Sequence, residues 1–246
     1  MDTGSDVRAQ FPDPAGNLAF DEALLREGPA APVLWLWRNP LSVVVGRGQK
    51  VEREVRVAEC ARDGVPVLRR ASGGGTVFHD PGNLNVTLVL PGPTDKPLEM
   101  LGLVMSAAVE KLGLVPRLGE RGLFVGEAKL CGFAVFRTKD GLLAHSTLLV
   151  DTDATRVGAY LTAAPPDPKP LDSHRSAVAS LADHGVHPAE GEVEAVVRAA
   201  AAGLLGPLVP RPPTDAELAR RRTLLHTRYH YPQWHSDGKQ RRDQSP

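Results

Sequence analysis

The stretch Arg69–Asn83, RRASGGGTVFHDPGN, places two arginines before three consecutive glycines and then continues into a strand-like Thr-Val-Phe. A Gly-Gly-Gly run loses much backbone entropy on folding and packs no side chain, so it needs a specific role. The usual roles are a tight turn and a backbone that a ligand approaches closely. A Walker A loop or a dinucleotide fingerprint is not indicated, because no Gly-Lys-Ser/Thr follows and a strand comes next.

An anion site is one interpretation of this stretch. The exposed N–H groups of Gly73, Gly74 and Gly75, with Arg69 and Arg70 beside them, can hold a phosphate or a carboxylate. The residues leave a second interpretation open, in which the glycines form a bulge and the arginines are solvated.

A second candidate site surrounds Lys129, in the stretch GEAKLCG at 126–132. Strand alternation predicts that Lys129, Cys131 and Phe133 share one face. A partly buried lysine can stabilise a phosphate or an oxyanion, but a lysine can also protect an edge strand from aggregation. Cys131 is either a nucleophile with a lowered pKa or an inert core residue.

Two histidines in these stretches, His79 and His145, can act as bases. Neither lies in a recognisable Ser/His/Asp order along the chain, and a histidine in a turn or a strand is an ordinary structural feature. The sequence alone therefore assigns them no catalytic role.

Composition limits the function classes. The chain has 246 residues, of which 42% are hydrophobic, enough for one large domain with a full core. Lys+Arg and Asp+Glu both number 29, so no global field favours nucleic acid or a membrane surface. Two cysteines without zinc spacing exclude a disulfide scaffold, and the N-terminus has no signal-peptide pattern. We expect a cytoplasmic protein that binds neither nucleic acid nor membrane.

The hydrophobic pattern predicts an α+β fold, with runs of strands interrupted by helices. Strand 33–37 is predicted to pair with strand 42–45, and strand 76–78 is predicted to form a hairpin with strand 84–90. A further hairpin turn is predicted at 138–141. The predicted helices cover 17–25, 51–63, 98–112, 192–205 and 215–227, and the predicted strands cover 33–37, 42–45, 66–68, 76–78, 84–90, 123–125, 129–136 and 142–150.

Five stretches together resemble the lipoate–protein ligase A family, within the biotin/lipoate ligase and octanoyltransferase superfamily. They are NLAFDEA at 17–23, VVGRGQ at 44–49, 69–85, KLCG at 129–132 and HSTLL at 145–149, in family order and at family-like spacing. The resemblance implies a mixed β-sheet with flanking helices, of the biotin/lipoate ligase catalytic-domain type, over residues 1–185. Residues 186–235 are then expected to form a C-terminal helical extension of that domain, and 236–246 a disordered tail.

The resemblance also implies an activity: lipoate is activated with Mg-ATP to lipoyl-AMP, and the lipoyl group passes to a lysine of a lipoyl-domain protein. Expected acceptors are 2-oxoacid dehydrogenase E2 subunits and the glycine cleavage H protein. Lys129 is expected to be catalytic, and no residue is assigned to a metal. Substrate and nucleotide are expected to contact Arg70, Ser72, Gly73, Gly74, Gly75, Thr76, Val77, Phe78, His79, Asp80, Asn83, Gly132 and His145.

Departures from the family pattern keep alternatives open. Cys131 stands where the family often has serine, and Ser146 where it often has glycine. A Cys131 thioester would make the chain an octanoyl or lipoyl transferase that uses no ATP, although the intact glycines favour the ligase. A non-catalytic lipoate-binding protein is a third alternative, and an intact Lys129 argues against it. The short chain after residue 181 leaves little room for an accessory domain, so a separate accessory protein is one expectation.

Overall fold

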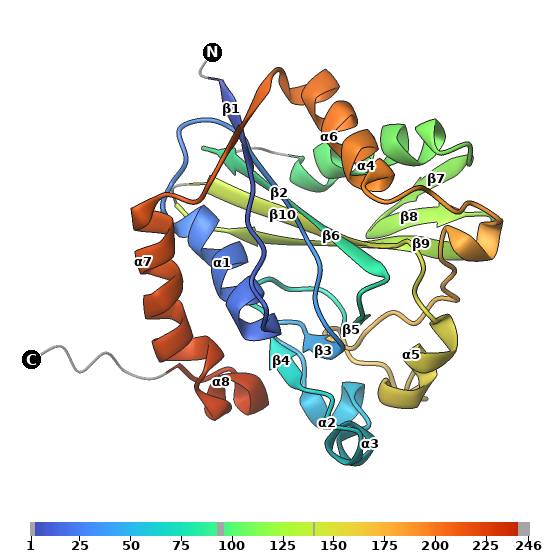
Figure 1. The fold of residues 1–246 in the computed structure, drawn as a ribbon. Helices are drawn as coiled ribbons and strands as arrows, with labels where there is room; N and C mark the ends of the chain where they lie inside the picture. Colours follow the sequence, from blue (N-terminus) through green and yellow to red (C-terminus); the bar gives the residue numbers. More distant parts are fainter. Residues whose placement is uncertain (1–2, 93–95, 140, 241–246) are drawn as a thin grey trace, which may run out of the picture.

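An eight-stranded mixed sheet organises the computed structural model of the chain, which describes residues 3–92, 96–139 and 141–240 (Figure 1). Its strand order is β11-β1-β2-β6-β10-β9-β8-β7; β1 runs parallel to both of its neighbours, and the other pairs are antiparallel. The strands are β1 (Gly4–Val7), β2 (Val33–Trp37), β6 (Asn83–Pro91), β7 (Pro116–Gly119), β8 (Gly122–Val125), β9 (Ala128–Arg137), β10 (Gly141–Leu149) and β11 (Leu208–Arg211). The α+β fold with a mixed sheet is confirmed.

A second, three-stranded sheet contains β3 (Ser42–Val45) between β4 (Val67–Arg69) and β5 (Val77–His79). The predicted pairing of 33–37 with 42–45 is therefore wrong, because β2 and β3 belong to different sheets. Both strands are buried along their whole length. A fully buried apolar run does not reveal which strand it pairs with, so its sequence could not indicate the partner.

The predicted hairpin of 76–78 with 84–90 is also wrong. β5 pairs with β3, whereas β6 pairs with β2 and β10. The turn between them is closed locally: the Asn83 N–H donates to the Asp80 carbonyl, and Asn83 Nδ2 donates to Asp80 Oδ1. This turn carries the chain from the small sheet to the large one.

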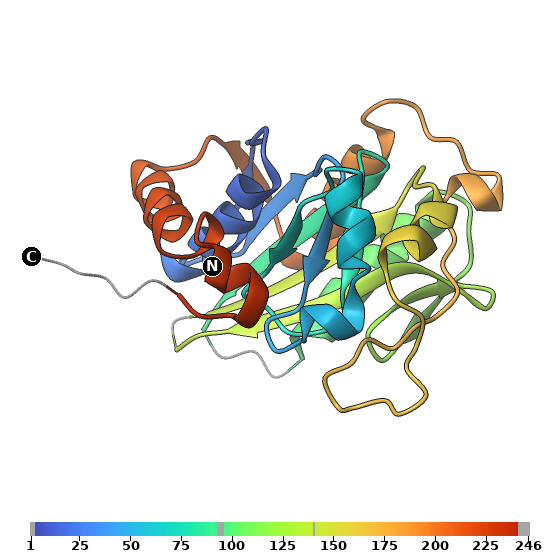
Figure 2. The ribbon, with the colours of Figure 1, turned by 90° about the horizontal axis from the view of Figure 1, so that it is seen from below.

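Helices cover both faces of the large sheet (Figures 1 and 2). α4 and α6 pack on one face with Leu34, Val86 and Leu148, while α1 packs on the other with Trp35, Trp37 and the small sheet. The helices are α1 (Pro14–Arg26), α2 (Val51–Glu54), α3 (Val57–Arg62), α4 (Pro97–Lys111), α5 (Ala154–Tyr160), α6 (Glu192–Leu205), α7 (Asp215–Leu224) and α8 (Pro232–Asp237), with a 3-10 turn at Ala182–His184 and a π-helical turn at Leu225–Tyr229.

The helix predictions at 17–25, 98–112 and 192–205 are close to α1, α4 and α6. The single helix predicted over 51–63 is two short helices, because Val55 is extended and bridges to Leu161. The 138–141 turn joins β9 to β10 as predicted, although Asp140 lies outside the described residues.

The C-terminal part joins the main fold through β11, which pairs with β1. α8 continues to Asp237, so the expected boundary at residue 236 falls inside a helix. Residues 241–246 of the expected disordered tail lie outside the described residues.

Candidate functional site

The three glycines of the loop between β4 and β5 occupy three different environments. Gly74 has a φ of +83°, which disfavours any residue with a Cβ, and its carbonyl oxygen lies against Gly46. A Cβ on Gly75 would lie 2.9 Å from Ser173 Oγ. A Cβ on Gly73 would have no neighbouring atom within 4 Å, so open space borders the loop there.

The glycine loop also presents unused hydrogen-bond donors. Within the described residues, the backbone N–H groups of Gly73, Gly74 and Gly75 donate to no protein acceptor, whereas the next N–H, that of Thr76, donates to Ser173 Oγ at 2.7 Å. Successive free N–H groups form an anion-binding concavity. The loop therefore has the donor arrangement that a phosphate or a carboxylate requires.

Arg70 lies beneath this loop, with its donors turned toward the protein. Its guanidinium donates to the carbonyls of Val44, Gly73 and Gly75, and its Nε donates to Ser72 Oγ. Burial lowers the pKa of Arg70 to about 10, which keeps it cationic at neutral pH. Arg70 therefore holds the loop in shape and adds positive charge below it. Its guanidinium does not face a ligand, contrary to what the sequence had suggested.

Arg69 points away from the loop, because successive strand residues face opposite sides. Arg69 is neither an anion ligand nor a solvated arginine, the two roles that the sequence left open. It is 1% exposed, and its guanidinium donates to six backbone carbonyls. Three acceptors belong to the segment after β3 and three to α8: Gly46, Arg47, Gln49, Trp234, His235 and Ser236. These hydrogen bonds hold α8 against the segment that follows β3.

We expect Arg69→Leu to lower the free energy of unfolding by about 3 kcal/mol, because it leaves several buried carbonyls without a donor. Denaturant unfolding of the purified variant measures this. Arg62→Leu is the control, since the Arg62 side chain is 69% exposed in its ion pair with Asp63, and its loss should leave the free energy of unfolding nearly unchanged. Equal stabilities of the two variants would contradict the assignment.

Lys129 lies on β9 on the opposite face from Cys131, so the predicted common face for Lys129, Cys131 and Phe133 is wrong. β8 pairs Leu123 with Cys131 and Phe124 with Lys129, which leaves Leu130 as an extra residue in a bulge. A bulge shifts the alternation of side chains by one residue. Leu130 and Cys131 therefore both enter the core, and Lys129 faces the side of the sheet that carries His145 and Thr147.

The Lys129 ammonium is half-buried, and its Nζ lies 5.5 Å from the centre of the Phe124 ring. No described carboxylate forms an ion pair with it, and burial lowers its pKa. A partly desolvated cation without a protein counter-charge is suited to stabilising an anion.

The segment 173–179 connects Lys129 with the glycine loop. Its backbone pairs with Lys129 through the Ala177 carbonyl and the Ala179 N–H, at 2.8 and 3.2 Å. At its other end, Ser173 Oγ accepts from Thr76 N, and Arg175 Nη1 donates to the Thr76 carbonyl. This contact was not predicted from the sequence, because the segment carries no periodic pattern. It links the strand that carries Lys129 to the end of the glycine loop.

Cys131 has the environment of a core residue. It is 1% exposed, packs with Leu130 and Leu148, and burial raises its pKa to about 12. A thiol that stays protonated and faces away from Lys129 is a poor nucleophile. The structure thus favours the inert alternative for Cys131.

A hydrogen-bonded chain that the sequence did not reveal joins Asp21, His145 and Ser72. Asp21 Oδ2 lies 2.8 Å from His145 Nδ1, and His145 Nε2 lies 2.7 Å from Ser72 Oγ. Thr87 donates to the other Asp21 oxygen. The three residues come from α1, β10 and the glycine loop, so their order along the chain did not indicate that they meet. The sequence offered one hint, because Asp21 lies within the family-like stretch 17–23.

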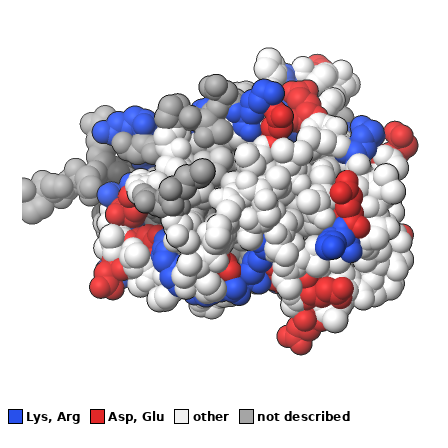
Figure 3. All heavy atoms as spheres, turned by 90° about the horizontal axis from the view of Figure 1, so that it is seen from above, with Lys and Arg blue, Asp and Glu red and all other residues white. Residues whose placement is uncertain are grey.

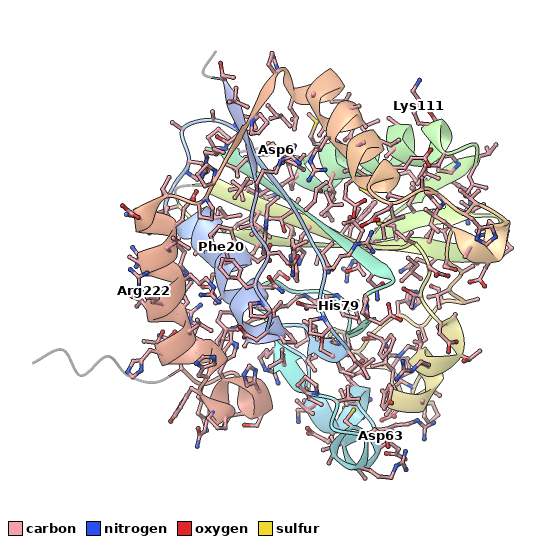
Figure 4. All side chains as sticks on the ribbon, viewed as in Figure 1. Asp6, Phe20, Asp63, His79, Lys111 and Arg222 are labelled. Carbon is pink, nitrogen blue, oxygen red and sulfur yellow. The ribbon has the colours of Figure 1, made fainter. Side chains whose placement is uncertain are left out.

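His79 is structural: Asn39 Nδ2 donates to its Nδ1, its Nε2 lies 3.2 Å from Thr147 Oγ1, and burial lowers its pKa to about 3 (Figure 4). Asp80 and Asn83 likewise bond within their own turn, where Thr152 also donates to Asp80. The side chains of these three predicted site residues thus bond to other protein groups.

The remaining predicted residues divide between core and site. Phe78 stacks on Tyr160, with ring centres 5.7 Å apart, and Val77 pairs with Val44, so both side chains support the small sheet. Thr76 is tied to Gln49. Gly132 pairs with Thr147, and a Cβ there would have no neighbour within 4 Å, so open space borders the sheet beside Thr147.

Figure 3 shows a large uncharged area on one face, with Lys and Arg atoms along its lower left edge and Asp and Glu atoms at its lower right. Within the described residues, no group of three or more His, Cys, Asp or Glu side chains is placed to hold a metal ion. None of the helices in that part of the chain has both the length and the apolar character needed to cross a bilayer.

Known proteins resemble the chain in sequence and in fold. Residues 13–204 match the family model described as the lipoyl protein ligase A/B catalytic domain. A relative from Aeropyrum pernix, provisionally named lipoate-protein ligase A, is 39% identical over 150 residues, which are 58% of this chain and 56% of that protein. The chain thus matches little more than half the length of this relative.

Two solved structures are similar over nearly all of the chain. One comes from a study of a bi-partite lipoate protein ligase and its E2 lipoyl domain from Thermoplasma acidophilum; it is 28% identical, with a TM-score of 0.87 and full coverage of both chains. The other is a lipoate-protein ligase A bound with ATP; it is 26% identical, with a TM-score of 0.87, covering 96% of this chain and all of the other.

Proposed function

The chain belongs to the lipoyl protein ligase A/B catalytic domain family, and on that premise we propose that it is a lipoate–protein ligase. It activates lipoate with Mg-ATP to lipoyl-AMP and transfers the lipoyl group to a lysine of a lipoyl-domain protein. The observation that carries this proposal is the row of N–H groups at Gly73–Gly75 that have no acceptor among the described residues. Segment 173–179 joins this row to a half-buried Lys129, which no described carboxylate pairs with.

Each half-reaction matches a feature of this site. In the first half, the lipoate carboxylate attacks the α-phosphorus of ATP and pyrophosphate leaves; free N–H groups and a lysine offset the negative charge of the phosphate. In the second half, the acceptor amine attacks the acyl carbonyl, and Lys129 stabilises the oxyanion. Two similar proteins support these substrates: one binds ATP, and the other belongs to a lipoylation system with an E2 lipoyl domain.

Mg²⁺ enters this proposal only as part of Mg-ATP. The described residues offer no cluster of protein ligands for it, and no residue is assigned to the metal. Carboxylates, carbonyls and phosphate oxygens are its usual ligands, and in nucleotide sites the phosphates supply several of them. Acceptors of the expected class are E2 subunits of 2-oxoacid dehydrogenases and the glycine cleavage H protein. Residues 186–235 act as part of the same domain, because β11 extends the large sheet.

Mass spectrometry of an apo lipoyl domain tests the function. The domain is incubated with the protein and lipoate plus Mg-ATP, and separately with the protein and octanoyl-carrier protein without ATP. A lipoyl adduct that forms only in the first reaction is expected. An octanoyl adduct in the second reaction would instead establish the transferase.

A cysteine substitution gives an independent test. Cys131→Ser should retain ATP-dependent lipoylation within about threefold, because the thiol is buried and lies on the face opposite Lys129. Placing a hydroxyl in the core should lower stability by about 1–3 kcal/mol. Cys60→Ser is the matched control, since Cys60 is also 1% exposed and its pKa is also raised by burial. Complete loss of transfer only in Cys131→Ser, with a hydroxylamine-sensitive acyl adduct on the parent protein, would establish a thioester route.

A further inference from the structure

The Asp21–His145–Ser72 chain has the connectivity of a nucleophile, a base and an orienting acid. Asp21 lies on α1 and is 5% exposed; His145 lies on β10; Ser72 begins the glycine loop. The contacts of 2.8 and 2.7 Å are both within hydrogen-bond range. Three separate elements thus bring together groups that can pass a proton.

The surrounding hydrogen bonds fix which atom carries which proton. Asp21 accepts from Thr87 through one oxygen, and Thr87 in turn accepts from Trp37 Nε1, so the carboxylate is held in place. The His145 Nδ1–H donates to the other Asp21 oxygen, which leaves Nε2 as an acceptor. Arg70 Nε–H donates to Ser72 Oγ, so the Ser72 hydroxyl proton points to His145 Nε2.

Ser72 Oγ keeps one more acceptor position, since a hydroxyl oxygen has two lone pairs and Arg70 uses one. The next residue, Gly73, borders open space and has a free N–H group. The end of the proton chain therefore adjoins the place where the loop can bind the acyl-adenylate.

Only the second half-reaction needs a base. A lysine side chain with a pKa near 10.4 is neutral in roughly one molecule in 2,500 at pH 7, so it loses one proton before it attacks, and it loses a second proton as the amide forms. Lipoate is already a carboxylate and attacks ATP directly. A base at this site would therefore act on transfer and not on adenylation.

Other titratable groups of the site do not fit this role. His79 is hydrogen-bonded to the Asn39 amide and the Thr147 hydroxyl, neither of which is a carboxylate, and burial lowers its pKa to about 3. Lys129 serves the proposed function as a cation, and Cys131 faces the other side of the sheet. His145 differs in its partners: its Nδ1 lies 2.8 Å from the Asp21 carboxylate, and its Nε2 lies 2.7 Å from the Ser72 hydroxyl at the start of the glycine loop.

We propose that Ser72 and His145, with Asp21 as positioning residue, form a proton relay for the transfer half-reaction; the inference rests on the proposed function. The acceptor lysine attacks as the neutral amine, after its ammonium proton has passed to water. As the C–N bond forms, one of the two remaining amine protons moves to Ser72 Oγ and the Ser72 proton moves to His145 Nε2. The C–O bond to AMP breaks, and its electron pair leaves with AMP. The imidazolium is stabilised by Asp21 and then returns its proton to water.

Timing the two half-reactions separately tests the relay. Transfer is measured from preformed lipoyl-adenylate to an apo lipoyl domain, and adenylation by pyrophosphate release from lipoate and Mg-ATP. Asp21→Asn should slow transfer about 100-fold or more while adenylation stays within about threefold, and His145→Gln should slow transfer at least as much. Asp6→Asn is the control. Asp6 is a buried carboxylate on β1 that accepts a hydrogen bond from Arg198 of α6, and it lies well apart from His79 in Figure 4. This substitution should change neither rate.

Chemical rescue separates a proton-transfer role from a structural one. Free imidazole should restore part of the transfer rate of His145→Ala, and it should leave the rate of His145→Gln unchanged. Equal loss of both half-reactions, or an unchanged transfer rate in Asp21→Asn and His145→Gln, would overturn the relay. Failure of the parent protein to transfer from preformed lipoyl-adenylate would overturn the proposed function itself, and the relay with it.

Discussion

Lys129→Ala should lower acyl transfer about 100- to 1000-fold without loss of stability. That range is typical when one preorganised stabiliser of a developing oxyanion is removed. Lys129 forms no ion pair with a described carboxylate, and burial lowers its pKa, so its ammonium is held at a cost to folding. Transfer from preformed lipoyl-adenylate, followed by mass spectrometry, measures the first effect, and thermal unfolding measures the second.

Lys111→Ala is the matched control for Lys129→Ala. Lys111 lies exposed at the end of α4 (Figure 4), and its removal should leave transfer unchanged. Lys129→Arg should restore only part of the rate, because a planar guanidinium does not occupy the position of a compact ammonium. Transfer by Lys129→Ala within about threefold of the parent, at equal melting temperature, would reject the catalytic assignment.

The sequence predicted most elements of the fold but not how the strands pair. Local periodicity located α1, α4, α6 and the β9–β10 hairpin, because amphipathic spacing and turn residues are local signals. The partners of β3 and β5 depend on contacts between residues distant in sequence. Two neighbouring apolar runs therefore looked like a pair although they lie in different sheets.

Side-chain direction was predictable only where the strand is regular. Alternation placed Lys129 with Cys131, but the extra residue Leu130 in β9 separates them. The sequence does not indicate that open space borders Gly73 and Gly132. A glycine can equally be packed against a neighbour, as Gly75 is against Ser173. The motif indicated the right segment of chain, while the shape of the site depends on residues that surround it.

Groups from distant segments complete the site, and the sequence could not bring them together. Asp21 is 124 residues from His145, and Ser173 is 97 residues from Thr76, yet each pair is hydrogen-bonded. Arg69 is fastened to Trp234 across 165 residues. Neither periodicity nor spacing carries such information, so these partners become visible only in the folded chain.

The chain by itself should transfer lipoate from preformed lipoyl-adenylate readily but form the adenylate at least about tenfold more slowly than with an accessory protein. Closure matters for adenylation, because water must be excluded from the phosphate charges and from the reactive mixed anhydride. Transfer needs less: a bound adenylate, an oriented amine and Lys129.

Pyrophosphate release and acceptor lipoylation should be timed separately with the purified chain, with and without a candidate accessory protein. Stimulation of pyrophosphate release alone is expected, since the donors for the acyl phosphate are already present at Gly73–Gly75 and the missing contribution is enclosure. The Asp6→Asn chain with the same accessory protein controls for general stabilisation. Rapid pyrophosphate release by the chain alone would show that its own segments, such as 165–181 beside the glycine loop, already close the site, and the accessory protein would then have no part in adenylation.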